Sequence, residues 1–342
     1  MAHIGTCYNC DMKISELGEF GLIDILADLI KKDDTESDPD ILIDAGDDTA
    51  AWQSDATVNL TTVDCLVENI HFDLDKISWQ ELGWKALAVS LSDIAAMGGI
   101  PKYALFSLAL PQETNVEDVA ELYNGILELG QKYHVRVIGG NISKAPVLFI
   151  DSIVYGVTEA PNIMLTRSSA MPGDEIAVTG YLGAAAGGLK IISNDLVLAN
   201  NLKMPLTTAL NKPSPRIGEG QKLAADGVKC AMDLSDGLTS DLNHICRASR
   251  VGAVLNVDTV PVHPALKTAF GDNALDMALS GGEDYELLFT AGHDIMEDIK
   301  KQLDCPVTVV GKIVADDNCR ITLLDGSGKI YTPSGKGWNH FG

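Results

Sequence analysis

Strand-like and helix-like segments alternate along this chain, and the alternation restricts it to the α/β class of folds. Runs rich in β-branched residues predict strands at 58–64, 103–110, 135–138, 147–157, 176–179 and 230–232, and near Val254, Tyr285 and Val307. Apolar periodicity and capping residues predict helices over 78–97, 115–134, 195–203 and 217–225, and from about Asp236. Ser78 and Glu81 have the spacing of a capping box, so the start of the first helix is expected at that point.

The chain is 342 residues long, which suits two α/β domains better than one core. The pattern changes after Thr158, where a Pro-Gly-Asp turn at 172–174 precedes a new strand. We therefore expect a first domain over 1–158, with 1–17 as a leader, and a second over 159–342.

Composition and cysteine use favour a cytoplasmic protein. Hydrophobic residues make up 46% of the chain and charged residues 21%, and no apolar run approaches the roughly 20 residues that span a bilayer. The seven cysteines are scattered, which indicates a reducing compartment. Cys7 and Cys10 form a lone C-x-x-C, which is read either as part of the leader or as a zinc or redox pair.

The formal net charge is −23, which disfavours nucleic acid and anionic membranes as partners. Anionic substrates remain compatible with this charge if some acids bind divalent cations. The remaining acids are expected to form a solvated surface.

Several acids lie at strand ends and in glycine turns, where a sheet edge can bring them together. Mg²⁺ prefers hard oxygen ligands of this kind. The alternative reading is capping, because Asp and Glu are common in turns and at helix starts. Asp93 favours the metal reading, since it lies in an otherwise apolar helical stretch. The group consists of Asp47, Asp48, Asp64, Asp93, Asp233, Asp236, Glu283 and Asp284.

The common phosphate-binding and hydrolase motifs are absent from the sequence: it has no G-x-x-x-x-G-K-[ST], no G-x-S-x-G and no H-E-x-x-H. The candidate phosphate cradles are a Gly-Gly-Asn turn at 139–141 and the glycine-rich bend at 180–188. Both stretches also suit close packing of a helix on a sheet.

Taken in order, these segments resemble the thiamine-monophosphate kinase family, of the aminoimidazole ribonucleotide synthetase-like superfamily. The resemblance begins at residue 18 and covers nearly all of the chain that follows. Its blocks include G-D-D-T-A (46–50), D-C-L-V-E-N-I-H-F (64–72), K-A-L-A-V-S-L-S-D-I-A-A-M-G-G-I-P (85–101), I-G-G-N (138–141), L-T-R-S (165–168), P-S-P-R (213–216), D-L-S-D-G-L-T-S-D-L (233–242), L-S-G-G-E-D-Y-E-L (279–287) and G-W-N-H-F (337–341).

The resemblance implies a first domain that forms half of a β-barrel and dimerises, and an α/β sandwich as second domain. It implies ATP and thiamine monophosphate as substrates, with several Mg²⁺ ions. By position, the implied metal ligands are Asp48, Thr62, Asp64, Asp93, Asp233 and Asp236. The implied ATP contacts are Gly140, Asn141, Arg167 and Ser235, and the implied thiamine contacts are His71, Glu283 and Trp338.

These roles suit direct phosphoryl transfer. The acceptor is a phosphate that is already anionic at neutral pH, so neither a catalytic base nor a covalent enzyme intermediate is required. Arg167 can pair with a phosphate as a planar fork. Trp338 offers an aromatic face to a thiazolium or pyrimidine ring, or alternatively fills a gap in the core.

Two positions depart from the family pattern. Asn141 stands where the family usually has aspartate, and Val63 stands where it has threonine. The amide keeps an oxygen ligand without its charge, whereas Val63 offers only its backbone carbonyl. These departures support the alternative of a catalytically weak or silent paralogue that binds thiamine phosphate and ATP. Another ATP-dependent enzyme of the superfamily is a second alternative. Selenophosphate synthetase and the hydrogenase-maturation dehydratase are disfavoured, since the cysteines that they need are missing from the corresponding positions.

Overall fold

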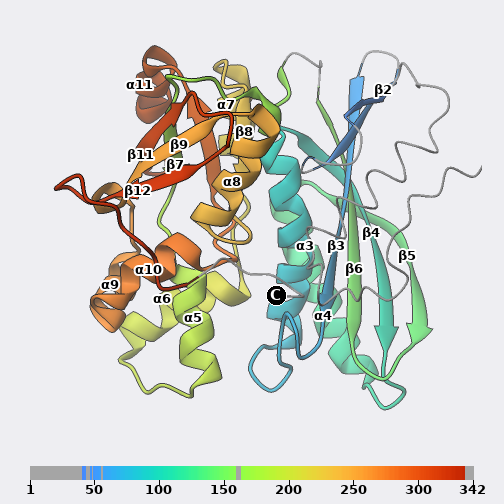
Figure 1. Ribbon diagram of the computed structural model, residues 1–342. Coiled ribbons are helices and arrows are strands. Elements are labelled where there is room, and N and C mark those ends of the chain that lie inside the picture. Colours follow the sequence, from blue (N-terminus) through green and yellow to red (C-terminus); the bar gives the residue numbers. More distant parts are fainter. Residues whose placement is uncertain (1–40, 44–46, 48, 55–56, 159–162, 336–342) are drawn as a thin grey trace, which may run out of the picture.

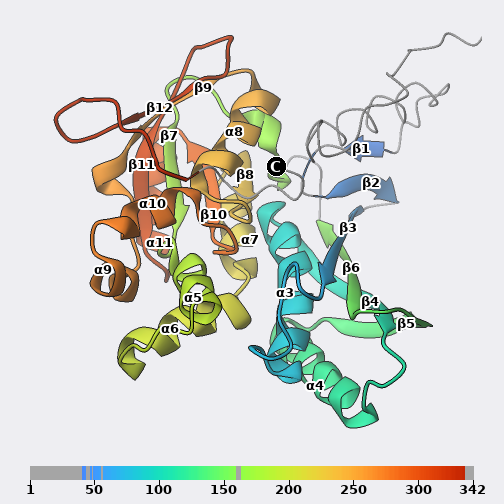
Figure 2. The same cartoon turned by 60° about the horizontal axis from the view of Figure 1, so that its bottom comes forward.

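A computed structural model describes residues 41–43, 47, 49–54, 57–158 and 163–335. Within these residues the chain forms two six-stranded sheets, each covered by helices, and the two units lie side by side (Figures 1 and 2). The expected α/β class is confirmed. None of the helices in the described ranges is both long enough and apolar enough to cross a membrane.

The first sheet has the strand order β1-β2-β3-β6-β4-β5, and only the β4–β5 pair is parallel. Two helices, α3 and α4, pack on one of its faces (Figure 2). The side chains between the helices and the sheet form a buried core, which includes Phe106, Leu108 and Ile150 of the strands. The elements are β1 (Ile41–Ile43), β2 (Ala50–Ser54), β3 (Thr57–Val67), α3 (Trp79–Ala96), β4 (Ile100–Leu110), α4 (Val116–Tyr133), β5 (Arg136–Lys144) and β6 (Phe149–Thr158).

Local sequence explains where these helices begin and how closely they pack. The capping box predicted at Ser78 and Glu81 is confirmed, with both of its hydrogen bonds present. Helices α3 and α4 approach each other through Gly83 and Gly125. A Cβ on Gly83 would lie 1.8 Å from the carbonyl oxygen of Leu122, so no other residue fits there without moving the backbone.

The second sheet has the order β12-β9-β11-β7-β10-β8, with only β12 and β9 parallel. Its strands are β7 (Glu175–Thr179), β8 (Cys230–Asp233), β9 (Gly252–Asn256), β10 (Leu287–Ala291), β11 (Val307–Val314) and β12 (Ile321–Leu324). The helices around it are η2 (Arg167–Ser169), α5 (Ala184–Ser193), α6 (Asn200–Asn211), α7 (Ile217–Ala225), α8 (Leu238–Ser249), η3 (Val257–Thr259), α9 (Pro264–Phe270), α10 (Asn273–Ser280) and α11 (His293–Gln302).

Helix α3 lies where the two units meet (Figure 1). It packs on the first sheet and also touches α7 and β8 of the second unit. Leu87 and Ile94 of α3 belong to the same buried cluster as Phe289 and Met296 of the second unit. The two units therefore share a core, and side chains on α3 can reach both sheets.

Three sequence predictions need correction. Asp64 lies inside β3 rather than at its end, because the strand continues to Val67. Residues 139–141 form part of strand β5 rather than a turn. The helix expected at 195–203 is α6, which starts at Asn200 and holds Pro205 within it. The domain boundary at residue 159 remains a prediction, although the first sheet ends at Thr158 and the second begins at Glu175.

Candidate active site

Two carboxylates of the first unit meet along α3. The Thr62 hydroxyl on β3 donates a hydrogen bond to the Asp93 carboxylate on α3. In the opposite sense, the Ser90 hydroxyl on α3 donates to Asp64 on β3, at 2.7 Å from its Oδ2. Thr62 and Asp64 are two residues apart on a strand, so both side chains face the helix.

The same helix reaches two acids of the second unit. The buried Ser92 hydroxyl donates to Oδ2 of Asp233, at the end of β8, over 2.7 Å. Lys85 is 1% exposed, and its Nζ lies 2.8 Å from Oε1 of Glu283. Both contacts cross between the two units, so the relative position of the units fixes the geometry of the site.

A buried tyrosine marks the point where these acids converge. Burial raises the pKa of Tyr285 well above its usual value, and the charges of Glu283, Asp64, Asp233 and Asp93 raise this pKa further. All four carboxylates are therefore close enough to act on one phenol. The acids come from β3, α3, β8 and the 281–286 loop, and not from one edge of one sheet as the sequence suggested.

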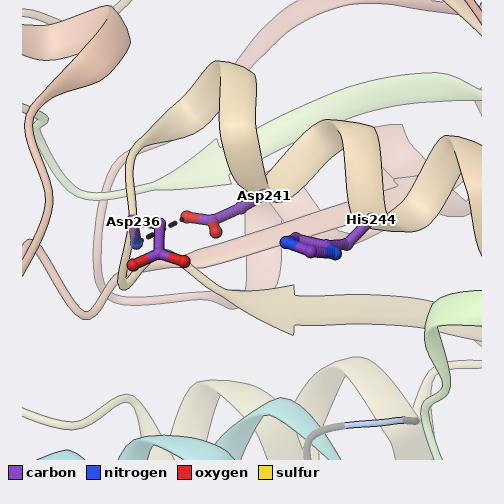
Figure 3. A group of neighbouring side chains, drawn as sticks. All are labelled: Asp236, Asp241 and His244. Atoms are coloured by element: carbon purple, nitrogen blue, oxygen red, sulfur yellow. Dashed lines mark hydrogen bonds between the residues drawn. The ribbon is translucent and has the colours of Figure 1, made fainter. Parts of the chain in front are cut away.

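The cluster continues into the segment after β8. Ser235 accepts a hydrogen bond from the backbone N–H of Glu283 through its carbonyl oxygen, at 2.8 Å. Asp236, Asp241 and His244 each offer one ligand atom, and these atoms lie within 4.8 Å of one another (Figure 3). Asp233 and Asp236 thus lie in one continuous acidic region.

Arg167 lies in η2 against an acid of the first unit. Its backbone N–H donates to Oδ2 of Asp47 over 3.1 Å, and its Nε lies 3.7 Å from Oδ1 of the same residue. A phosphate that binds Arg167 therefore competes with Asp47. The predicted metal ligand Asp48 and the predicted thiamine contact Trp338 lie outside the described residues.

The structure does not bring Gly140 and Asn141 to the carboxylates within one chain. Across the sheet, Asn141 pairs with Ser107, Ser107 with Asp151, and Asp151 with Cys65. Cys65 directly follows Asp64 on β3, so this row of paired residues is adjacent to the row that contains Asp64. Asp64 faces α3, so alternation turns Asn141 toward the opposite face of the sheet. Three strand spacings of about 4.8 Å also separate β5 from β3.

Gly140 and Val63 have structural explanations in a single chain. A Cβ on Gly140 would lie 2.1 Å from the carbonyl oxygen of Phe106, so glycine permits the close pairing of β5 with β4. Val63 points away from α3, and its side chain is exposed. Only its backbone remains a candidate ligand.

His71 lies in the turn after β3. Its Nδ1 accepts a hydrogen bond from the backbone N–H of Val67, at 3.0 Å. The neutral ring therefore carries its proton on Nε2. This contact fixes the ring of the predicted thiamine contact close to the end of β3.

The glycine-rich bend at 180–188 holds a carboxylate of the protein itself. Asp284 accepts hydrogen bonds from the backbone N–H groups of Gly183 and Ala185, at 2.6 and 3.4 Å. Burial raises the pKa of Asp284 to about 7, although these hydrogen bonds oppose the shift. Of the two readings of this bend, close packing is supported, because a Cβ on Gly183 would lie 2.6 Å from Leu266.

Sequence reasoning missed the residues that hold the acids in place. Lys85, Ser90 and Ser92 all lie on α3, at positions that looked like ordinary members of an apolar helix. Polar residues on the buried face of a helix were the available signal, since a buried charge or hydroxyl requires a partner. The same signal applies to Asp241, which is 1% exposed.

Comparison with known proteins gives the class. Residues 46–158 match the family model of the AIR synthase related protein N-terminal domain, and residues 171–323 match that of the C-terminal domain. A solved complex of AaThiL with AMPPCP and TMP superposes with a TM-score of 0.83, at 32% identity, and covers 96% of this chain and 99% of that one. The fold and the two matched domains define an AIR synthase related protein.

Individual relatives narrow this class. Thiamine-monophosphate kinase of Aquifex aeolicus is 35% identical over 96% of this chain and 100% of its own length. The enzyme of the same name from Escherichia coli K12 is 36% identical over 95% of this chain and 98% of its own. The crystal structure of thiamine-monophosphate kinase from Stenotrophomonas maltophilia has a TM-score of 0.73 at 34% identity, covering 86% of this chain and 95% of that one. This chain belongs to the thiamine-monophosphate kinase family.

Proposed function

We propose that this chain phosphorylates thiamine monophosphate with ATP, giving thiamine diphosphate and ADP. The observation that carries the proposal is the convergence of Asp64, Asp93 and Asp233 on α3, between the two units. The family relatives and the solved complex with AMPPCP and TMP supply the substrates.

The reaction joins two anions directly. An oxygen of the thiamine phosphate attacks the γ-phosphorus of ATP, and the bond from that phosphorus to the bridging oxygen of ADP breaks. The second pKa of the acceptor phosphate is about 6, so the nucleophile is anionic without a base. The protein then has to position both substrates in line and to offset their charge.

The donor set supports binding of Mg²⁺. Asp64, Asp93 and Asp233 offer hard carboxylate oxygens, and Thr62 adds a hydroxyl, which are the ligand types that Mg²⁺ takes. We propose these residues, together with Asp48 and Asp236, as the magnesium ligands. When bound, the ions would neutralise the phosphates. Ser90 and Ser92 hold the carboxylates in orientation through their hydrogen bonds.

Glu283 is proposed to contact the thiamine part, with Lys85 holding its side chain. Glu283 has a left-handed backbone with φ of 66°, and its backbone N–H donates a hydrogen bond to the carbonyl oxygen of Ser235. These contacts place a fixed carboxylate next to the metal ligands. We further assign ATP contacts to Arg167 and Ser235, and thiamine contacts to His71 and Trp338.

We also propose that the protein is a homodimer, in which the outer face of the first sheet packs against the same face of the partner. Both described helices of this unit cover the other face. The outer face carries exposed apolar side chains, including Val63 at 60% and Tyr103 at 44% exposure. Asn141 lies on this face, so its proposed contact with ATP is a property of the dimer rather than of one chain. An open sheet face of this kind is expected to pair or to be covered.

The test is product formation from ATP and thiamine monophosphate at saturating magnesium, followed by separation of the thiamine phosphates. Thiamine diphosphate appearing at the expense of ATP supports the proposal. Binding of both substrates without product would instead identify a silent paralogue. Hydrolysis of ATP without phosphorylated thiamine would indicate another reaction of the superfamily.

A further inference from the structure

A nitrogen-containing cluster lies at the start of α8. Asp236 precedes the helix, whereas Asp241 and His244 lie three residues apart on it and therefore share a face. One ligand atom of each residue lies within 4.8 Å of the others. Figure 3 shows the Asp241 carboxylate between the Asp236 carboxylate and the His244 ring.

One oxygen of this cluster is buried without a hydrogen bond. Oδ2 of Asp241 accepts the backbone N–H groups of Asp236 and Gly237, at 3.2 and 3.0 Å. Oδ1 of Asp241 is buried and has no hydrogen-bond partner among the described residues. A buried acceptor that is left unpaired is destabilising. This oxygen points into the space shared with Asp236 and His244, so a cation bound there would satisfy it.

The donor types select the kind of cation. Mg²⁺ takes oxygen ligands almost entirely, whereas an imidazole nitrogen suits Zn²⁺, Fe²⁺ and Ni²⁺, and the carboxylates beside it also accept Mn²⁺. We propose that Asp236, Asp241 and His244 bind a divalent transition-metal ion, with His244 as its nitrogen ligand. The site shares Asp236 with the magnesium ligands proposed above, but it differs from them in donor chemistry.

Such a site would connect two parts of the acidic region. Asp236 belongs to the loop that follows Asp233, and the backbone N–H groups of this loop already bond to Asp241. An ion held by all three side chains would fix this loop to the first turns of α8. It would therefore stabilise the folded state even without nucleotide.

The experiment measures Mn²⁺ binding in the absence of ATP and thiamine monophosphate. Mn²⁺ is titrated to saturation into the metal-free protein, because Mg²⁺ bound at the shared Asp236 would compete for the site. Pulsed electron paramagnetic resonance detects the coupling of Mn²⁺ to a directly coordinated ¹⁴N nucleus. The proteins compared are wild type, His244→Asn, Asp241→Asn and the control His293→Asn, which alters an exposed histidine on α11.

The site predicts a ¹⁴N coupling in wild type and in the control, and none in His244→Asn. Loss of a residue that hydrogen-bonds to a metal ligand weakens metal binding about 10- to 100-fold. Loss of a ligand itself should cost at least as much, so His244→Asn and Asp241→Asn should each weaken Mn²⁺ binding at least tenfold. In Asp241→Asn the side-chain amide oxygen can still accept the two backbone N–H groups, so the fold should persist and circular dichroism should be unchanged.

Absence of bound Mn²⁺ or of a ¹⁴N coupling in wild type would overturn the site. So would a coupling that survives in His244→Asn. The kinase assignment is read separately, from product formation with Mg²⁺. Nitrogen-coordinated Mn²⁺ in a chain that makes no thiamine diphosphate would refute the proposed function and support the metal site. Formation of thiamine diphosphate without nitrogen-coordinated Mn²⁺ would support the proposed function and refute the metal site.

Discussion

Removal of Glu283 should destabilise the protein more than removal of Lys85, although the two form one ion pair. Lys85 is 1% exposed, whereas the Glu283 side chain is 27% exposed. Glu283→Ala leaves a buried ammonium without its carboxylate, and an uncompensated buried charge costs about 3–5 kcal/mol. Lys85→Met leaves a carboxylate that still meets water, so we expect a loss of only about 1 kcal/mol.

These energies correspond to measurable shifts in melting temperature. Unfolding entropy of about 2.1 cal/mol/K per residue gives about 0.7 kcal/mol/K for 342 residues. Glu283→Ala should then melt about 4–7 °C below wild type, and Lys85→Met about 1–2 °C below it. The double variant should melt above Glu283→Ala, because it removes the unpaired charge.

Differential scanning calorimetry of the four proteins forms a double-mutant cycle. Asp195→Asn is the control, since it removes an acid whose ion pair with Lys76 is exposed. It should lower the melting temperature by no more than about 1 °C. A double variant that melts below Glu283→Ala would refute the reasoning, because it would show that Lys85 stabilises the protein independently of Glu283.

Mg²⁺ with ATP should raise the melting temperature more than either alone, and identical melting curves would contradict a metal cluster. The Asp284 carboxyl has a folded pKa of about 7, above its unfolded value of about 3.9, so its protonation favours the folded state and stability should fall as pH rises from about 4 to 7. Asp284→Asn should reduce this slope in melting temperatures measured from pH 5 to 8, and an unchanged slope would refute the assignment. Asn141→Asp should lower the Mg²⁺ concentration for half-maximal rate if Asn141 faces metal-bound ATP, whereas unchanged Mg²⁺ and ATP dependences would show that it does not.

Local patterns were sufficient for parts of this fold. The capping box at Ser78 placed the start of α3 correctly, because it depends on residues three apart. Asp93 was recognised because an acid in an apolar helix requires a partner, and it receives the Thr62 hydroxyl.

Other features depend on contacts that sequence spacing does not reveal. Gly139 and Gly140 suggested a turn, but Gly140 instead allows β5 to pair closely with Phe106 on β4. Nothing local marks Lys85 as the buried partner of an acid, because the Glu283 that it pairs with lies about 200 residues further along the chain. The acids converge because α3 lies between the two units, and that arrangement follows from a shared core rather than from any local motif.

In the proposed mechanism, carboxylates from both units, gathered along α3, carry phosphoryl transfer to thiamine monophosphate. The most direct measurement is the rate of thiamine diphosphate formation at saturating Mg²⁺ and ATP for wild type, Asp93→Asn and the surface control Asp195→Asn. Asp195 pairs with Lys76 and has an 82% exposed side chain, so its loss should leave the rate unchanged. We predict that Asp93→Asn slows the reaction about 100-fold or more with its circular dichroism unchanged, since charge offset supplies most of the transition-state stabilisation. A rate for Asp93→Asn close to that of wild type would contradict the account.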